Sequence, residues 1–348
     1  MTAPAGAAKA DPPAALGPAQ ARGLADSLAR MGLAAPDARF TPLEGGVSSL
    51  IVRVDAAGRT FCLKGALAKL KVAAEWTAPL ERSGAEVAWM RLAAGVVPGI
   101  VPEILGEDRE GHAFAMAFLD PSSHPVWKAQ LLAGHADPRT TQAVARALAA
   151  IHRATAGDEA CARAFANDAN FFALRLDPYF GAAAEAHPDC APVLRELIAA
   201  TAAARIALVH GDVSPKNVLV GPSGPVLLDA ECAWYGDPAF DAAFLLNHLL
   251  LKCAWRPASA AGYLACFDAF REAYFAGAGW EPAAALEART ARLLAAMLLA
   301  RVDGKSPVEY LTDEGARERV RRFARSLLLG GGESLAAIRA RWTREHAA

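Results

Sequence analysis

The residues with the clearest chemical potential lie in two short polar segments, each next to an apolar run. The first segment reads HGDVSPKN over residues 210–217, and the second reads LLDAE over residues 227–231. Asp212 precedes Asn217 by five residues, and Asp229 lies twelve residues beyond Asn217. Phosphoryl transfer needs a carboxylate that orients the attacking hydroxyl, together with oxygen ligands for Mg²⁺ on the ATP phosphates. Turn formation explains any one of these residues but not the spaced set, which therefore predicts phosphoryl transfer.

The elements that would position these segments are short strands inside a helical region. Apolar runs at 206–209, 218–220 and 226–228 predict three strands with polar residues in the gaps between them. Loops carried by such strands are frequent sites of chemistry. From residue 137 onward the rest of the sequence has mostly helical periodicity. It predicts helices over 140–152, 192–204, 237–251, 258–276, 282–302 and 314–329.

The first third of the chain has a different pattern. A helical period over 16–33 precedes short, partly alternating runs at 40–43, 50–55 and 60–63, which predict an antiparallel meander. A helix is expected over 75–94, followed by strands over 101–105 and 112–119. These patterns predict an α+β protein with a small β-rich lobe over 21–119 and a mostly helical lobe over 120–348. Residues 1–20, rich in Ala, Pro and Gly, are expected to form a disordered tail.

The two polar segments, with the following WYGDPAFD at 234–241, resemble the aminoglycoside phosphotransferase and choline kinase-like family. That family shares the protein-kinase fold, so the resemblance implies two lobes with ATP and Mg²⁺ between them. By position it implies that Asp212 is the catalytic base and that Asn217 and Asp229 bind Mg²⁺. It also implies that Asp241 is a structural carboxylate that holds the catalytic loop.

A kinase of this kind needs a glycine-containing hairpin over the phosphates, and LEGGVSS at 43–49 supplies a candidate. Glycine lets the backbone approach phosphate oxygens, and small hydroxyl side chains can donate hydrogen bonds to them. The candidate nucleotide-binding residues in this hairpin are Gly45, Gly46, Ser48 and Ser49.

The strand lysine of the family is expected at Lys64, at the end of the apolar run FCLK. Its glutamate partner on the following helix is expected at Glu86, with Glu81 and then Glu75 as the alternatives. The segment MAFL at 116–119 fits the connection between the lobes, so Met116, Ala117 and Leu119 are candidates for adenine contacts. A plain core strand is the alternative reading of that segment.

Several stretches resemble methylthioribose kinases more specifically: KGAL at 64–67 up to Glu75, VWK at 126–128, and the region from Phe171 to Phe180. DAE at 229–231 resembles the acidic metal motif of those enzymes, so Glu231 is a third candidate metal ligand. Asn217 and Ala230 depart from that pattern, in which Ser and Pro are usual. The general phosphotransferase pattern fits the catalytic loop better.

Three further residues are candidates for acceptor contacts. Trp234 and Tyr235 follow the metal motif closely, although they are equally explained as core aromatics. Arg301 lies in the polar turn RVDGKSP after a strongly apolar helix, where a basic helix end followed by glycine is the simpler reading.

Composition excludes some classes of function. The net charge is −1, which disfavours a general nucleic-acid binder, and no apolar run approaches the ~20 residues of a membrane span. The six cysteines include no CxxC pair and are expected to be reduced, buried thiols. We therefore expect a cytoplasmic enzyme, monomeric or homodimeric, that acts on a small hydroxyl compound.

The leading hypothesis is an ATP-dependent small-molecule kinase, with a sugar-like acceptor similar to methylthioribose favoured. An aminoglycoside O-phosphotransferase remains the main alternative, and a nucleotide-binding pseudokinase scaffold is the alternative from another class. In residues 250–348, Lys and Arg outnumber Asp and Glu. A site for a polycationic aminoglycoside should be lined by carboxylates, so this charge favours a neutral or anionic acceptor.

Overall fold

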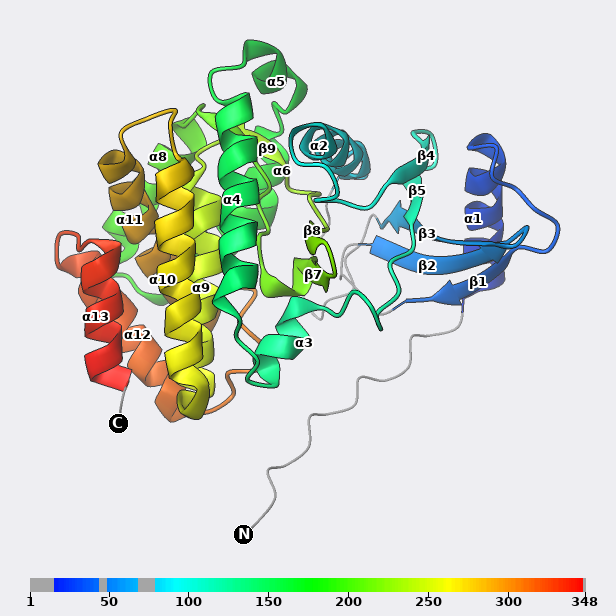
Figure 1. The fold of residues 1–348 in the computed structure, drawn as a ribbon. Coiled ribbons are helices and arrows are strands. Elements are labelled where there is room, and N and C mark those ends of the chain that lie inside the picture. Colours follow the sequence, from blue (N-terminus) through cyan, green and yellow to red (C-terminus); the bar gives the residue numbers. More distant parts are fainter. Residues whose placement is uncertain (1–15, 44–48, 68–78, 347–348) are drawn as a thin grey trace, which may run out of the picture. The chain divides into compact units, whose positions relative to one another are not determined.

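A five-stranded antiparallel sheet forms the first part of the protein, in the order β1-β2-β3-β5-β4 (Figure 1). The structure is a computed structural model, and it describes residues 16–43, 49–67 and 79–346. The strands are β1 (Arg39–Pro42), β2 (Ser49–Ala56), β3 (Arg59–Ala66), β4 (Ile104–Asp108) and β5 (Ala113–Ala117). The predicted meander is therefore present, with strand ends that differ from expectation by a few residues.

One face of this sheet is covered by the first helix, α1 (Pro18–Arg30). Leu24 and Leu28, one helical turn apart, pack with alternate residues of the strands, including Val52, Val54 and Leu63. Because neighbouring side chains of a strand point to opposite faces, Lys64 lies on the face away from this core. The helix begins at Pro18, inside the stretch expected to be a disordered tail; residues 1–15 of that stretch lie outside the described residues.

The chain divides into two compact units that do not coincide with a single cut in the sequence. The first comprises Met1–Ser83 and Glu103–Phe118, and the second comprises Gly84–Pro102 and Leu119–Ala348. Most of α2 (Arg82–Val96) thus belongs to the second unit, whereas the sequence placed this helix in the N-terminal lobe. The boundary after Phe118 falls inside the segment that was expected to connect the lobes.

The second unit is mostly helical. Long helices α4, α9 and α10 lie side by side, and α11 packs against α9 (Figure 1). The six helices predicted from periodicity are found here within four residues of their expected ends. They are α4 (Pro138–Thr155), α8 (Ala191–Ala203), α9 (Ala239–Trp255), α10 (Ala260–Gly277), α11 (Ala283–Asp303) and α12 (Glu314–Leu329).

Several shorter elements of this unit were not predicted. They are α3 (Trp127–Leu132), α5 (Glu159–Ala164), α6 (Asp168–Phe171), the π-helix η1 (Phe172–Gly181), α7 (Ala182–Ala186), a 3₁₀ turn η3 (Pro257–Ser259) and α13 (Leu335–His346). The π-helix contains Pro178, a residue that in sequence indicates a helix boundary rather than a continuation.

All six cysteines are free and buried, as the sequence predicted. Across residues 16–43, 49–67 and 79–346, no helix combines the length and the apolar character that a membrane span requires.

Candidate phosphoryl-transfer site

Two small two-stranded sheets position the polar segments found in the sequence. β6 (Ala207–Val209) pairs with β9 (Trp234–Gly236), and β7 (Val218–Gly221) pairs with β8 (Gly224–Leu227). The loop 210–217 leaves β6 and enters β7 through the 3₁₀ turn η2 (Pro215–Asn217), while the loop 228–233 runs from β8 back to β9. Both loops therefore begin and end at the same two sheets, which brings residues far apart in sequence next to one another.

The two loops are packed tightly against each other at Gly211. This residue has a φ of +80°, and a Cβ atom there would lie 2.8 Å from the carbonyl oxygen of Cys232. A left-handed backbone and the absence of a side chain are both needed here, so glycine is the only residue that fits without displacement. Nearby, Nε2 of His210 lies 3.1 Å from the carbonyl oxygen of Leu228 and joins the loops a second time.

Asp241, at the start of α9, anchors the loop 210–217. Its carboxylate accepts hydrogen bonds of 2.8 Å from the backbone N–H groups of both His210 and Gly211. Nε2 of His152 lies 3.2 Å from the same carboxylate, and the other ring nitrogen lies 2.8 Å from the Tyr274 hydroxyl. Asp241 thus has the structural role that the resemblance implied. The sequence did not reveal His152 of α4, which contacts Asp241, or Tyr274 of α10, which contacts His152.

Asp212 is held by a buried arginine that sequence reasoning missed. The guanidinium of Arg175, in η1, lies 3.0 Å from Asp212 Oδ2, and its Nε donates a hydrogen bond to the Gly211 carbonyl. Another nitrogen donates to the carbonyl of Leu174 at 2.7 Å. The only sequence signal was an arginine inside the otherwise apolar stretch FFALRL. Arg175 therefore fixes the carboxylate and the backbone beside it together.

The electrostatic surroundings keep Asp212 ionised. Burial alone would raise the pKa of this carboxyl, but the positive charges of Lys216 and Arg175 outweigh burial and lower it. Lys216 Nζ lies 3.2 Å from Asp212 Oδ2, and the carboxylate in turn raises the pKa of that lysine. Asp212 is only 4% exposed, so a charged acceptor of hydrogen bonds is held in a largely dry environment.

The β7–β8 hairpin brings the other two members of the spaced set together. Val218 pairs with Leu227, and the N–H of Leu228 donates to the carbonyl of Asn217 at 2.9 Å. Asn217, just before β7, is therefore adjacent to the chain that leads directly into Asp229. The side-chain nitrogen of Asn217 donates to the Asp212 carbonyl at 3.0 Å, so its Oδ1 is the atom available to bind a cation.

Asp229 has a φ of +67°, in the left-handed region that non-glycine residues seldom adopt. Such a conformation costs on the order of 1–3 kcal/mol and is found most often at functional sites. Mg²⁺ is usually held by one or two carboxylates together with phosphate oxygens. The donor chemistry of Asn217 and Asp229 fits that pattern, and Glu231, 7% exposed, follows two residues later. Within the described ranges, no group of three or more His, Cys, Asp or Glu residues forms a metal cage by itself.

The structure places the aromatic candidates Trp234 and Tyr235 in the core. Trp234 is 1% exposed, stacks on Phe171 with ring centroids 4.2 Å apart and donates to Asp168 at 2.8 Å. The Tyr235 hydroxyl lies 3.0 Å from the carbonyl oxygens of Thr155 and Ile206. These are the contacts of core aromatics, and we leave both residues out of the acceptor site proposed below.

The nucleotide-binding candidates belong to both units. Lys64 is 4% exposed in β3, between Ile51 of β2 and Phe114 of β5 in register, and Ser49 is buried at the start of β2. Glu86 is 2% exposed in α2, whereas Glu81 is exposed. Lys64 lies in the first unit and Glu86 in the second, so their pairing stays a prediction. The remaining candidates Gly45, Gly46 and Ser48, like Glu75, lie outside the described residues.

The segment 116–119, which was expected to connect the lobes, is also shared between the two units. Met116 and Ala117 are in β5, paired with Cys62 and Phe61 of β3, while Leu119 begins the next part of the second unit.

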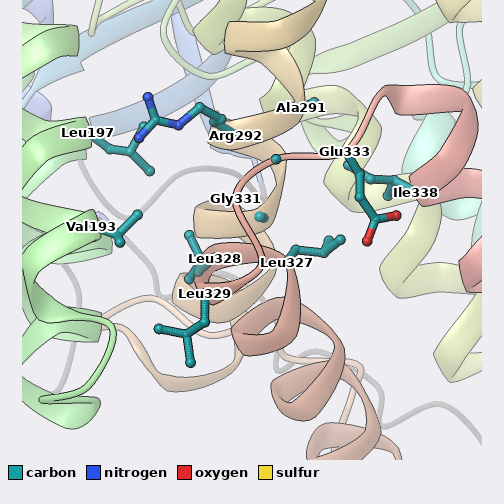
Figure 2. A pocket seen from close by; sticks show the side chains of 12 residues that line it. Val193, Leu197, Ala291, Arg292, Leu327, Leu328, Leu329, Gly331, Glu333 and Ile338 are labelled. Carbon is teal, nitrogen blue, oxygen red and sulfur yellow. The ribbon is translucent and has the colours of Figure 1, made fainter.

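A pocket of about 400 Å³ opens where α8, α11 and the turn between α12 and α13 meet (Figure 2). Its wall is mostly apolar, with Val193, Leu197 and Leu328 among the lining residues. Its charged residues are paired elsewhere, Arg292 with Glu196 at 3.0 Å and Glu333 with Arg341 at 2.7 Å. None of the sequence-predicted site residues lines this pocket, so it is separate from the candidate catalytic set.

Comparison with known proteins identifies the family and the fold. Residues 39–286 match the model of the phosphotransferase enzyme family, APH. A choline/ethanolamine kinase family protein from Mesorhizobium loti superposes with a TM-score of 0.51 at 17% identity, covering 92% of this chain and 99% of its own. Plasmodium vivax ethanolamine kinase also gives 0.51, at 11% identity over 83% and 82% of the two chains. No curated protein sequence is detectably similar. The predicted α+β protein-kinase-like fold is thus confirmed.

Proposed function

Since the chain belongs to the phosphotransferase enzyme family, we propose that it transfers the γ-phosphoryl group of ATP to a hydroxyl of a small, sugar-like metabolite. The single observation that carries this proposal is the state of Asp212. It is buried, ionised and fixed by Arg175, on a loop whose backbone is held by Asp241. Such a group is suited to orient an attacking hydroxyl and to accept its proton.

In the proposed reaction the acceptor oxygen forms a bond to the γ-phosphorus while the bond to the β–γ bridging oxygen breaks. ADP leaves, and the acceptor proton passes to Asp212. Asp212 is a weak base with a lowered pKa, so its main contribution is orientation and stabilisation of the developing positive charge on the hydroxyl.

The residues that would hold Mg²⁺ are Asn217, through Oδ1, and Asp229, with Glu231 as the third candidate. When bound, Mg²⁺ neutralises charge on the β- and γ-phosphates. Lys64 would position the α/β-phosphates with Glu86 as its partner, and the hairpin residues Gly45, Gly46, Ser48 and Ser49 would cover them. Met116, Ala117 and Leu119 would contact adenine. These nucleotide-side roles rest on the family resemblance.

The acceptor class follows from the resemblance to methylthioribose kinases and from the basic C-terminal region. The aminoglycoside alternative would place a polycation near Lys216, Arg175 and Arg301, which would repel it.

The test is a coupled ADP-release assay on the full chain with ATP and Mg²⁺. The panel should contain pentoses and thiopentoses, sugar acids, sugar phosphates, amino alcohols and kanamycin-type aminoglycosides. We expect acceptor-dependent ADP release with at least one sugar-like compound, and its loss in Asp212→Asn. If kanamycin-type substrates exceed every sugar-like compound tenfold in kcat/KM, the aminoglycoside alternative replaces the proposal.

A further inference from the structure

One face of α9 carries three buried polar side chains in a row. Asp241, His248 and Lys252 are seven and eleven residues apart, close to whole numbers of turns at 3.6 residues per turn, so they lie along one side of the helix. Their exposures are 0%, 5% and 1%. Asp241 anchors the catalytic loop, and His248 and Lys252 follow it about two and three turns further along. This face therefore leads from the catalytic loop toward the C-terminal end of α9, within the second unit.

His248 lacks a hydrogen-bond partner on either ring nitrogen among the residues that the structure describes. A buried polar group left unpaired costs free energy, and native proteins rarely tolerate one without a reason. Phe244, one turn earlier, packs beside the ring with centroids 5.6 Å apart. Burial lowers the pKa of His248 well below its ordinary value, and nearby positive charges lower it further. Those charges belong to Arg301, Lys252, Lys216 and Lys128.

Lys252 is also a buried polar side chain with positive charges nearby. Its ammonium lies 4.3 Å from the centre of the Tyr310 ring, whose buried hydroxyl has no partner among the described residues. The carboxylate that acts on Lys252 is Glu309, and Glu309 is already paired with Lys128. Burial, together with the charges of Lys128 and Arg301, lowers the pKa of Lys252 to about 7. The surroundings thus contain more positive charge than the chain itself compensates.

Arg301 links this region to the catalytic carboxylate. Its guanidinium lies 5.4 Å from the centre of the Tyr179 ring and donates to Ser306 Oγ at 2.9 Å, while its Nε has no partner in the described chain. On the same ring of Tyr179, the guanidinium of Arg175 lies 5.8 Å from the centroid. Arg175 is the residue that pairs with Asp212. The Tyr179 ring therefore contacts both Arg301 and Arg175, and Arg175 contacts the catalytic loop.

We propose that His248, Lys252, Arg301 and Tyr310, the anion cluster, bind an anionic group, a carboxylate or a phosphate, of the hydroxyl acceptor. This inference rests on the proposed kinase function and specifies its substrate class. An anion would supply hydrogen-bond partners for the imidazole, the Tyr310 hydroxyl and the Arg301 Nε at once, and would compensate the uneven charge. A cationic acceptor such as an amino alcohol or an aminoglycoside would instead meet the positive charge of Arg301 and the part-charged ammonium of Lys252.

The first test compares acceptors that differ only in the anionic group. With ribose as the neutral parent, ribose 5-phosphate tests a phosphate, and glucuronate against glucose tests a carboxylate on the same type of ring. We expect the wild-type chain to prefer one anionic member over its neutral parent by roughly 10–100-fold in kcat/KM, the range of one or two charge-assisted hydrogen bonds. The better of the two arms identifies the anionic group.

The second test uses variants of the anion cluster. Lys252→Met should remove most of that preference by raising KM for the anionic acceptor, with KM for ATP unchanged. Removing a buried charge of this kind is compatible with folding. Tyr310→Phe, which deletes only the hydroxyl, should reduce the preference less. Arg322→Met, which removes an exposed positive charge on α12, is the matched control and should leave the preference unchanged.

A binding measurement separates this inference from the kinase function. In calorimetry with inorganic phosphate, the wild-type chain should take up a proton near pH 7.5, because an anion beside Lys252 favours its charged form; Lys252→Met should not. Turnover of neutral sugars with no anionic preference and no phosphate binding would overturn the anion cluster and leave the kinase proposal intact. Phosphate binding that requires Lys252, without any turnover, would support the cluster and contradict the kinase proposal.

Discussion

Most buried polar groups of the catalytic loop have partners within the chain, the Ser214 hydroxyl being an exception among the described residues, whereas His248, farther along α9, has none for its ring nitrogens. In the loop, the backbone of His210 and Gly211, the carboxylate of Asp212 and the amide of Asn217 all have partners within the chain. Two turns along α9, both nitrogens of His248 are unpaired in the described structure. The loop is thus preorganised before any ligand arrives, whereas the anion cluster is completed only by a ligand. In the proposed function, the loop would carry out phosphoryl transfer and the anion cluster would select the acceptor.

The strongest way to break this comparison is to remove the charge from the catalytic carboxylate. Asp212→Asn retains the shape of the side chain but loses its negative charge, so we expect kcat to fall by about 10²–10⁴-fold. Circular dichroism and thermal unfolding should show a folded protein. A variant within about threefold of the wild-type kcat would mean that Asp212 is not the orienting group.

The metal-ligand assignment predicts the next largest effects. Asp229→Ala removes the carboxylate ligand, and we expect Mg²⁺-dependent turnover to be lost at ordinary Mg²⁺ concentrations. Asn217→Ala should weaken Mg²⁺ activation more mildly, on the order of 10-fold in the concentration required, because a neutral amide is the weaker ligand. The measurement is rate against Mg²⁺ concentration at fixed ATP. Identical activation curves for the wild type and Asp229→Ala would exclude the metal role.

Arg175 sharpens the comparison because it holds both the Asp212 carboxylate and the backbone of the catalytic loop. Arg175→Lys keeps the charge but loses the fork that holds both Asp212 and the Gly211 carbonyl, so we expect roughly a tenfold loss in kcat with KM for ATP unchanged. Weaker pairing should also let the lowered pKa of Asp212 rise, which moves the acidic limb of the pH–rate profile to higher pH. A lower rate with an unmoved acidic limb would indicate a purely structural arginine.

The smallest expected effect concerns stability and pH. Burial lowers the pKa of Lys252 to about 7 in the folded chain, whereas an unfolded lysine titrates near 10.4. Between these values the unfolded chain binds the proton and the folded chain does not, so the free energy of unfolding should rise with pH. Relative to Lys252→Met, the rise should be at most about 1.4 kcal/mol per pH unit over roughly pH 7–10. Denaturant unfolding at pH 7.5 and 9 measures it, and a flat difference would contradict the buried cation.

Much of the fold could be predicted because the signals were local. Partly alternating residues in β2 and helical periods in α4 and α12 report which face is buried, and those patterns do not depend on distant partners. The three-residue strand β9 was missed because its pairing with β6 is set by tertiary contacts rather than by its own pattern. The π-helix η1 was missed because Pro178 favours a break at that position.

The candidate site likewise contains residues that the sequence revealed and residues that it did not. Asp212, Asn217 and Asp229 are recognisable because their spacing reflects a hairpin, which is a local structure. Arg175, His248 and Lys252 are isolated charged or titratable residues in mostly apolar helices, and His152 is one of many polar residues of the amphipathic α4. Their importance depends on which side chains three-dimensional packing brings against them. Sequence periodicity marks such residues only as exceptions and does not say what they contact.

The anchoring of the catalytic loop also bears on the order in which the protein is completed during synthesis. The loop occupies residues 210–217, but its backbone is held by Asp241, which is in turn contacted by His152 and, through it, by Tyr274. A ribosome that has made residues 1–240 has produced the candidate catalytic aspartate without the carboxylate that holds the backbone of its loop. The ability to use ATP should therefore emerge only after α10 has left the exit tunnel, so that an incomplete chain does not consume nucleotide while it is still being translated.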